Sequence, residues 1–226
     1  MISKRLSSVR ERIANAAQRS GRNADDVELV IVTKFHPAEL VAELVDLGER
    51  NFGENKDQEA SAKAGALSSL RPDIAANWHF VGQLQSNKVK SVLRYASTIH
   101  SLDRDSLLAE LKKQLEKTDQ RVGCFIELNL TDDPGRGGLD PRNLSHFAEK
   151  VLSVPQINLL GIMAVAGLGA DPRIDFEKAV AASEALKSIS SESRFLSMGM
   201  SEDFELAIEL GATHVRVGSA ITGPRD

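Results

Sequence analysis

The stretch VELVIVT (27–33), followed by PAELVAELVDLG (37–48), decides the fold class. The first segment is a short, almost continuous apolar run rich in β-branched residues, which is typical of a strand buried on both faces. The second segment repeats its apolar residues at helical spacing after a proline, a residue favoured in the first turn of a helix. The pair predicts a strand followed by a helix, with Lys34 at the point where the strand ends.

Apolar runs and helical patterns alternate along the rest of the chain. The expected strands are 50–53, 77–82, 97–103, 121–130, 157–166, 194–199 and 213–218, and the expected helices are 54–67, 84–95, 106–117, 141–153, 174–189 and 201–211. This alternation indicates a parallel sheet covered by helices. About eight such units favour closure into a (β/α)8 TIM-type barrel over an open sheet, and no G-x-G-x-x-G motif follows the first strand. We therefore predict a single α/β barrel domain over residues 1–226.

An extra helix is expected over residues 1–20, before the first strand. Its apolar residues, among them Leu6, Val9 and Ile13, recur at helical spacing. The segment is rich in arginine, as organelle transit peptides are, but Glu11 lies among the arginines. The pattern therefore favours a helix packed on the domain.

The composition limits the classes of partner that this protein is expected to bind. The 226 residues are 42% hydrophobic and 27% charged, with a net charge of −4. A surface that reads phosphates usually carries a basic excess, so nucleic acid is not expected as a partner. No apolar stretch approaches the ~20 residues that span a bilayer, so no membrane partner is expected either. The single cysteine, Cys124, excludes an internal disulfide and fits a reducing, cytoplasmic setting; we expect a monomer there.

Lys34 is the first candidate for chemistry. In barrels of this class the active face is built from the carboxyl ends of the strands and the loops that follow them. A lysine held against the barrel wall is partly desolvated, which lowers its pKa and frees its amine to attack a carbonyl group. The alternative is a surface lysine that only extends its charged end into water.

The last two loops form the second candidate. SMGMSED (197–203) and VGSAITG (217–223) combine glycines, which let the backbone approach a ligand closely, with the hydroxyls of Ser201 and Ser219. Phosphate commonly binds barrels in the loops after strands seven and eight, where free N–H groups favour an anion. The plainer interpretation is that Ser201 caps a helix and Gly218 makes a tight turn.

Side chains on the strands add further candidates. Because residues alternate along a strand, Val215 and Val217 facing the helices would turn His214 and Arg216 into the barrel. A buried arginine needs an acceptor, which a ligand ring nitrogen or a carboxylate such as Glu127 would supply.

Asn55 and His79 follow or lie within the second and third strands. Each also has a structural interpretation: Asn55 as a helix cap, and His79 as a strand histidine with its hydrogen bonds satisfied. Asp103, at the end of the fourth strand, is similarly placed to cap the next helix.

A lysine able to form an imine and a phosphate cup at one barrel mouth suggest two ligand classes. One is a phosphorylated sugar aldehyde, as in a Schiff-base aldolase, and the other is pyridoxal 5′-phosphate (PLP). Several motifs, in this order, bear on the choice: VTKFHP, FGENKDQE, WHFVGQLQSNK, IHSLD, GIMAVA and LSMGMSEDFELAIELGATHVRVGSAITG. Together they resemble the pyridoxal-phosphate homeostasis protein family, whose members are single-domain relatives of the N-terminal barrel of alanine racemase, a fold-type III PLP protein. The resemblance covers nearly the whole chain and implies PLP as the cofactor.

The resemblance also implies roles for individual residues. Lys34 would hold PLP as an internal aldimine, and Ser201, Gly218 and Ser219 would hold its phosphate. Arg216 would approach the pyridine nitrogen, which discourages protonation of the ring and weakens PLP as an electron sink.

Asn55 and His79 would line the ring side of the cofactor. The chain departs from the family pattern at Ser219, where a threonine is frequent, and in the loop LTDDPGRGG (130–138), where Arg136 stands near the place of a lysine. The second departure leaves a role of this loop as a lid in doubt.

The resemblance implies a carrier or buffer of PLP that regulates vitamin B6 and amino-acid balance, with apo PLP-dependent enzymes as possible recipients and no assigned reaction. The alternative is a small amino-acid racemase. A two-base racemase takes a proton from one face of its substrate and returns it on the other. The chain has one tyrosine, Tyr95, expected at the end of a helix that runs away from the mouth. We therefore predict a binder of PLP rather than an enzyme.

Overall fold

In the part of the chain that the structure describes, eight parallel strands close into a barrel in the order in which they occur in the sequence. The structure is a computed structural model and describes residues 1–131, 133, 135–167, 169 and 171–224. The strands are β1 (Glu28–Val32), β2 (Asn51–Glu54), β3 (Asn77–Phe80), β4 (Ala96–Leu102), β5 (Val122–Leu128), β6 (Ile157–Ala164), β7 (Phe195–Ser197) and β8 (His214–Val217). Closure is made by β1 and β8, with Ile31 beside Val217. The predicted barrel is confirmed.

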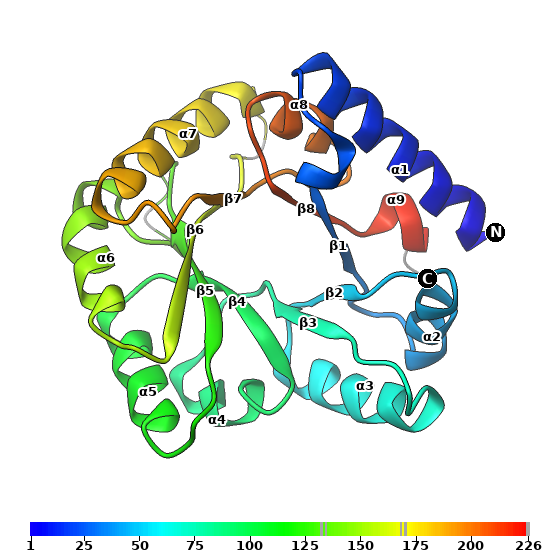
Figure 1. The fold of residues 1–226 in the computed structure, drawn as a ribbon, viewed down its shortest axis with the longest axis horizontal. Helices are drawn as coiled ribbons and strands as arrows, with labels where there is room; N and C mark the ends of the chain where they lie inside the picture. The colour runs from blue at the N-terminus through cyan, green and yellow to red at the C-terminus, as the bar shows by residue number, and fades with distance from the viewer. Residues whose placement is uncertain (132, 134, 168, 170, 225–226) are drawn as a thin grey trace.

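Helices surround the barrel on its outside (Figure 1). They are α1 (Ile2–Arg19), α2 (Ala38–Asp46), α3 (Asp57–Leu70), α4 (Val89–Val92), α5 (Asp105–Leu115), α6 (Leu144–Leu152), α7 (Pro172–Ile189), α8 (Phe204–Glu209) and α9 (Ser219–Thr222), with short 3-10 turns η1 (Ala24–Asp26), η2 (Ser86–Lys88) and η3 (Pro141–Asn143). None of the described helices is long and apolar enough to cross a membrane.

The predicted N-terminal helix is confirmed as α1. Leu6, Val9 and Ile13 on one face are buried. The helix packs beside α8 and α9 (Figure 1), and Arg12 pairs with Glu205 of α8 at 2.7 Å. It therefore covers the outer side of the junction where the barrel closes.

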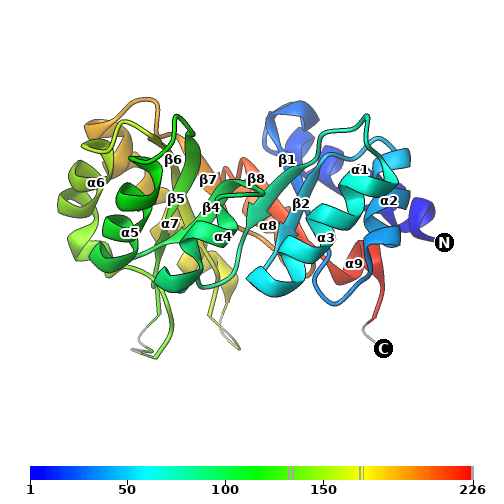
Figure 2. The same cartoon turned by 90° about the horizontal axis from the view of Figure 1, so that it is seen from below.

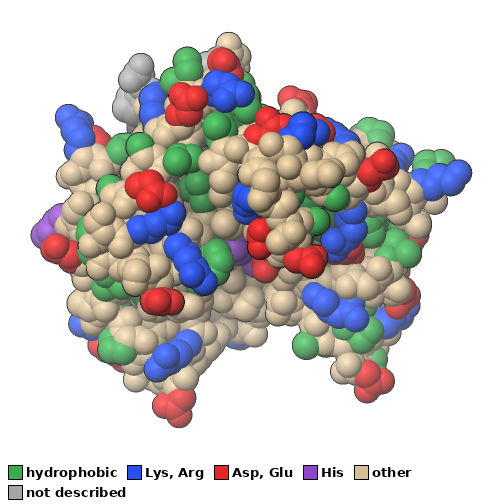
Figure 3. Space-filling model, turned by 45° about the horizontal axis from the view of Figure 1, so that its top comes forward, with side chains coloured by type: hydrophobic (Ala, Val, Ile, Leu, Met, Phe, Trp, Pro, Cys, Tyr) green, Lys and Arg blue, Asp and Glu red, His purple; other side chains and the backbone are tan. Residues whose placement is uncertain are grey.

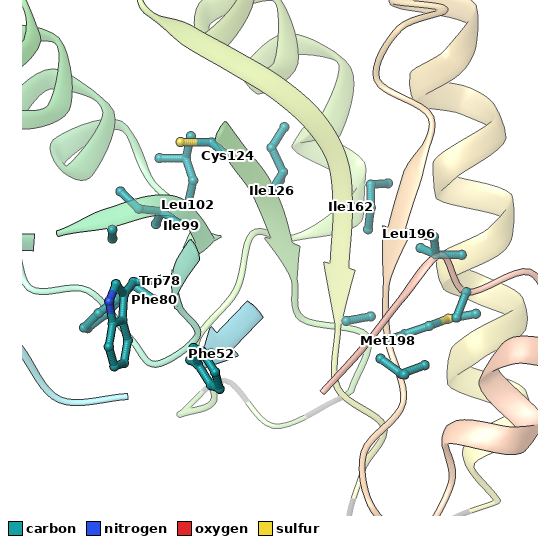
Figure 4. Close-up of a cluster of buried hydrophobic side chains, with 14 of the residues drawn as sticks. Phe52, Trp78, Phe80, Ile99, Leu102, Cys124, Ile126, Ile162, Leu196 and Met198 are labelled. Atoms are coloured by element: carbon teal, nitrogen blue, oxygen red, sulfur yellow. The ribbon is translucent and has the colours of Figure 1, made fainter. Parts of the chain in front are cut away.

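The main core lies between the strands and the helices. Phe52, Trp78 and Phe80 point outward from neighbouring strands into this layer, together with Ile99, Cys124 and Ile162 further round the barrel (Figure 4). The rings of Phe52 and Trp78 are 5.8 Å apart. Because strand residues alternate, the same pattern turns His79 into the barrel.

The carboxyl ends of the strands gather at one end of the barrel. In Figure 2 the described parts of the loops after β5 and β6 leave from the lower side of the molecule, where α9 also lies. We call this end the mouth. On the face drawn in Figure 3, acidic and basic side chains are interspersed.

Two helices differ from their predicted extents. The pattern over 84–95 forms the 3-10 turn η2 and only one turn of α-helix, α4. The helix expected from residue 201 begins at Phe204, because Asp203 Oδ1 accepts from the N–H of Met200 at 2.6 Å and closes a turn before it. The short helix α9, which starts at Ser219, has no counterpart in the predicted pattern.

Candidate functional site at the barrel mouth

Lys34 lies two residues after the end of β1 and is partly buried at the mouth. The residues on both sides of it are held in place. Thr33 is fully buried, and its N–H donates to the carbonyl of Gly53 at 3.1 Å. Phe35 has a φ of 68°, which is unusual for a residue with a side chain and, among the described residues, is found otherwise only at glycines. The backbone that carries Lys34 is therefore specified on either side.

Three hydrogen-bond donors converge beside the end of β1. The hydroxyl of Ser201 accepts from the N–H of Gly218 at 3.3 Å and from the N–H of Ala220 at 3.4 Å. The Ser219 hydroxyl lies 3.4 Å from the same oxygen. A side chain at Gly218 would approach the carbonyl of Val32 to 3.3 Å, which shows how closely this turn lies against β1.

These contacts exclude Ser201 as the cap of α8 and show that the loops after β7 and β8 lie together. Ser201 does not cap α8, because Asp203 is the residue before that helix. Ser201, Gly218 and Ser219 instead lie together, as the two loops predicted. The Gly199 turn between β7 and Ser201 has a φ of 92°, and a Cβ there would come within 2.6 Å of the Cβ of Ala207. Glycine is thus required for this turn to pack against α8.

Asn55 lies at the end of β2, next to the start of α3. It does not cap α3, since Lys56 occupies the cap position. Its Oδ1 is buried and has no hydrogen-bond partner among the described residues. A Cβ on Gly82 would lie 2.3 Å from the carbonyl of Asn55, so glycine is needed for the loop after β3 to pass over this residue. A buried acceptor without a partner is costly, which marks Asn55 as a place where a ligand would contribute a donor.

Arg216 points into the barrel, as the alternation predicts. Its guanidinium donates to Ser197 Oγ at 2.6 Å and to the carbonyl of Ala164 at 3.0 Å. Ala164 and Ser197 are the last residues of β6 and β7, so the guanidinium lies at the floor of the mouth. Burial lowers the pKa of Arg216 to about 10, although the charges of Glu127 and Asp203 act to raise it.

Of the two acceptors expected for Arg216, the carboxylate of Glu127 is not the one found: within the protein, the guanidinium bonds a serine hydroxyl and a backbone carbonyl. A ligand ring nitrogen beside Arg216 stays a prediction. Glu127 instead accepts from the amide of Gln83 at 2.5 Å. Burial, with Asp103 nearby, raises the pKa of Glu127 to about 7, while Arg216 and Arg136 act to lower it.

His79 belongs to a chain of histidines inside the barrel. Its Nδ1 lies 3.0 Å from Nε2 of His100, whose Nδ1 lies 2.9 Å from Ser197 Oγ. On its other side, His79 Nε2 lies 3.7 Å from Glu28 Oε1 at the amino end of β1. These contacts favour the structural interpretation of His79, and its place beside a cofactor ring stays a prediction.

A third histidine that points into the barrel, His214, is the first residue of β8 and lies at the amino end of the barrel. Its Nε2 lies 3.4 Å from Glu28 Oε1, and its ring contacts Phe125 with centroids 5.1 Å apart. Burial lowers the pKa of His79 to about 3 and that of His214 to about 4, and it holds the pKa of His100 well below the ordinary value. The histidine chain is therefore neutral at physiological pH, and it connects through Ser197 to Arg216.

Two further predictions concern Asp103 and the loop after β5. Asp103 does not cap α5; its carboxylate accepts from Arg104 at 2.6 Å and from the N–H of Gly138 at 3.3 Å. The loop predicted as a doubtful lid includes residues 132 and 134, which lie outside the described residues. Within its described part, Arg136 donates to the carbonyls of Val165 and Ala166 at 3.1 and 2.9 Å.

The sequence reasoning missed two residues around the site. Ser197 links Arg216 to the histidines, and Lys63 forms a buried ion pair with Glu54, the last residue of β2. The only local signal for Lys63 was its position four residues after Glu59, which suits an ion pair on a helix. For Ser197, the two-residue alternation of β7 indicates an inward side chain, but alternation does not identify its bonding partner on another strand.

A closed parallel barrel with a lysine after the first strand and converging donors after the last fits both classes considered from the sequence, and comparison with known proteins places the chain among the barrels related to alanine racemase. The chain matches the family described as alanine racemase, N-terminal domain, over residues 5–226. It is 38% identical to the pyridoxal phosphate homeostasis protein of Aquifex aeolicus (98% of this chain, 97% of the relative) and 35% identical to the protein of that name from Escherichia coli K12 (100% and 97%). The chain therefore belongs to the alanine racemase N-terminal domain family and, within it, to the pyridoxal phosphate homeostasis proteins, as the motifs predicted.

A solved structure of the same kind is also similar. PipY of Synechococcus elongatus PCC7942, determined with PLP bound, superposes with a TM-score of 0.86 at 32% identity, covering 99% of this chain and all of PipY.

Proposed function

We propose that this protein binds PLP at the barrel mouth and carries or buffers it, contributing to vitamin B6 and amino-acid homeostasis. The observation that carries the proposal is the convergence of the Gly218, Ala220 and Ser219 donors on Ser201, beside β1, the strand that precedes Lys34. An amine and an anion-binding turn on adjacent strands match the two ends of a phosphorylated aldehyde. The names of the relatives and the PLP bound to PipY support the same ligand.

The residues present fit the cofactor. When bound, PLP supplies an aldehyde carbon, with which the Lys34 amine can condense with release of water. Ser201, Ser219 and the N–H of Gly218 would hold the phosphate, since hydroxyls and converging backbone N–H groups favour an anion. The buried Oδ1 of Asn55, which has no partner within the described residues, would accept a hydrogen bond from the ligand. Arg216 would face the ring from the floor, and as a cation it would disfavour a proton on the ring nitrogen.

We further propose that the protein hands PLP on rather than turning over amino acids. Racemisation needs a second base on the opposite face of the substrate. Tyr95 directly precedes β4, whose carboxyl end at Leu102 is the end nearer the mouth. Burial, with Asp57 and Glu54 nearby, raises the pKa of its hydroxyl well above the ordinary value, so the phenolate is scarce at neutral pH. Apo PLP-dependent enzymes are the proposed recipients, with the protein acting as a monomer.

A cytoplasmic setting remains our proposal for the compartment. The one cysteine, Cys124, is a fully buried thiol whose pKa burial raises to about 12, which suits a protein that needs no disulfide.

The proposal is tested by the absorption spectrum of the purified protein with and without PLP, followed by borohydride reduction and peptide mapping. We expect a visible band that reduction removes and a stable adduct on Lys34. An adduct on Lys56 or Lys88 would overturn the assignment. Titration with amino acids then separates carrier from enzyme, since efficient exchange of the α-proton of alanine would contradict the carrier function.

A further inference from the structure

A buried ionic cluster lies directly beneath the turn that carries Lys34. Lys63, on α3, donates from Nζ to Glu54 Oε1 at 2.5 Å and to Glu59 Oε1 at 3.0 Å. The side chains of Lys63 and Glu54 are only 4% and 1% exposed. We call Glu54, Glu59 and Lys63 the brace. Buried charges are costly unless they are paired, so a buried pair at this position needs a reason.

The brace holds the residue before Lys34. Thr33 Oγ1 donates to Glu54 Oε1 at 2.6 Å, and the carbonyl of Thr33 accepts from Lys63 Nζ at 2.8 Å. With its N–H bonded to Gly53, every polar group of Thr33 is engaged. The peptide bond that enters Lys34 therefore has a set orientation.

The brace also holds the residue after Lys34. The N–H of Phe35 donates to Glu59 Oε1 at 2.5 Å, the same oxygen that Lys63 contacts. Phe35 is the described non-glycine residue with a positive φ, 68°, a conformation that persists only where the surroundings impose it. The peptide bond that leaves Lys34 is thus held from the same cluster as the one that enters it.

Fixing both flanking peptides restricts φ and ψ of Lys34 and with them the direction of its Cα–Cβ bond. A small error in that direction is amplified along a four-carbon side chain. Attack on a carbonyl requires the amine at about 3–3.5 Å in a defined approach, so preorganised direction contributes to covalent attachment.

We propose that Glu54, Glu59 and Lys63 are positioning residues that direct the Lys34 amine into the barrel mouth. This inference rests on the proposed function, because the reaction it serves is the condensation of that amine with an aldehyde. It assigns to the brace a role in covalent attachment that is separate from holding the phosphate, which is the task of the turns after β7 and β8.

The test compares Glu59→Ala with Glu59→Gln. Alanine removes the acceptor of the Phe35 N–H, whereas glutamine keeps an oxygen that can accept it. In the protein without PLP, we expect the amide exchange of Phe35 to accelerate by at least about tenfold in Glu59→Ala, since a hydrogen bond to a charged group is lost. In the presence of PLP, we expect the ratio of reducible, Lys34-linked PLP to total bound PLP to fall markedly in Glu59→Ala and to stay near the parent value in Glu59→Gln.

A second variant tests the buried pair itself. Lys63→Met alone leaves the Glu54 carboxylate buried without its partner, so Glu54→Gln/Lys63→Met, which removes both charges, is the appropriate variant if the single one fails to fold. We expect it to retain phosphate-dependent binding of PLP and to lose most of the linked fraction. The control is Lys90→Met, which removes an exposed lysine on α4.

The outcomes separate this inference from the proposed function. Faster exchange at Phe35 with an unchanged linked fraction would overturn the positioning role, and so would equal loss of linked PLP in Glu59→Gln. Failure of the parent protein to bind PLP would contradict the proposed function itself, whatever the amide exchange shows.

Discussion

The two sides of the barrel mouth are built differently. On the lysine side, Thr33 and Phe35 are held by bonds of 2.5–2.8 Å to the brace, much of it buried. On the serine side, the donors that meet at Ser201 do so at 3.3–3.4 Å, and Ser219 is exposed. Short bonds to a largely buried cluster specify one backbone geometry, whereas longer, partly exposed ones are readily exchanged for bonds to an anion.

The difference indicates that covalent attachment and anion binding require opposite properties of the surrounding residues. A nucleophile has to be aimed before the ligand arrives, so its surroundings are satisfied internally. An anion site needs donors that are only weakly engaged. The N–H groups of Gly218 and Ala220 contact Ser201 Oγ only weakly. A phosphate oxygen beside Ser201 would accept stronger, charge-assisted hydrogen bonds from these donors and from the two serine hydroxyls.

The largest effect is expected from Lys34→Ala. The variant should lose the borohydride-reducible link completely while retaining measurable binding of PLP, because the serine side is untouched. Absorption spectra and equilibrium dialysis measure the two properties separately. Lys90→Ala, at an exposed position on α4, is the control, and it should behave as the parent. Complete loss of PLP binding in Lys34→Ala would show that the two sides of the mouth do not act independently.

Ser201→Ala/Ser219→Ala should produce the next largest effect. Hydrogen bonds to a charged group contribute ~1.5–3 kcal/mol each, so we expect PLP affinity to fall by at least about tenfold. Pyridoxal, which lacks the phosphate, should be bound nearly as well as by the parent. Ser188→Ala, at an exposed position on α7, is the control. Equal losses for the two ligands would remove these serines from the phosphate site.

Much of this architecture is readable from the sequence, because it depends on local periodicity. The strand and helix alternation from residue 27 onward indicates the barrel, and the two-residue period turns His214 and Arg216 inward. The two glycine and serine turns are recognisable because they follow the last two strands. The matching motifs add the identity of the ligand, which no period or spacing supplies.

The residues that were missed depend on contacts between distant segments. Lys63 bonds the carbonyl of Thr33, 30 residues away, and Arg216 bonds Ser197, 19 residues away. Neither contact follows from a local pattern, because it is set by strand register and by the rotation of α3. The start of α8 was misplaced for a related reason: Asp203 and Ser201 are both good capping residues, and only the packing of the turn decides between them.

Ser197→Ala should destabilise the protein by about 1.5–3 kcal/mol, since the buried guanidinium of Arg216 loses its closest acceptor. Urea unfolding of the protein without PLP measures this change directly. The visible spectrum of the PLP complex should also change, because Arg216 is free to move at the floor of the mouth. Ser193, buried near Leu159 on the outside of the barrel, offers a matched control in Ser193→Ala, which should destabilise without altering the spectrum. An unchanged spectrum in Ser197→Ala would show that the anchoring of Arg216 has no bearing on the ligand.

The smallest effect we expect comes from the amino end of the barrel, through the pH dependence of stability. Burial depresses the pKa of His79 from 6.5 to about 3. Between these values the unfolded chain binds a proton that the folded protein does not. The contribution of neutral His79 to the free energy of unfolding is therefore complete above about pH 6.5 and is lost as the pH falls. At about pH 5 the loss from one such histidine is about 2 kcal/mol, at 1.36 kcal/mol per pH unit below 6.5.

His79→Gln keeps a polar side chain beside His100 but removes this titration. The difference in unfolding free energy between about pH 7.5 and about pH 5 should therefore shrink by about 2 kcal/mol relative to the parent. His146→Gln, on the exposed face of α6, is the control and should leave the difference unchanged. PLP affinity at neutral pH should hardly change in His79→Gln, because the described contacts of His79 are with Glu28, Asn51 and His100. A large loss of PLP affinity would instead place His79 on the cofactor's ring side. It would also mean that residues at the amino end of the barrel interior contribute to ligand binding at the mouth.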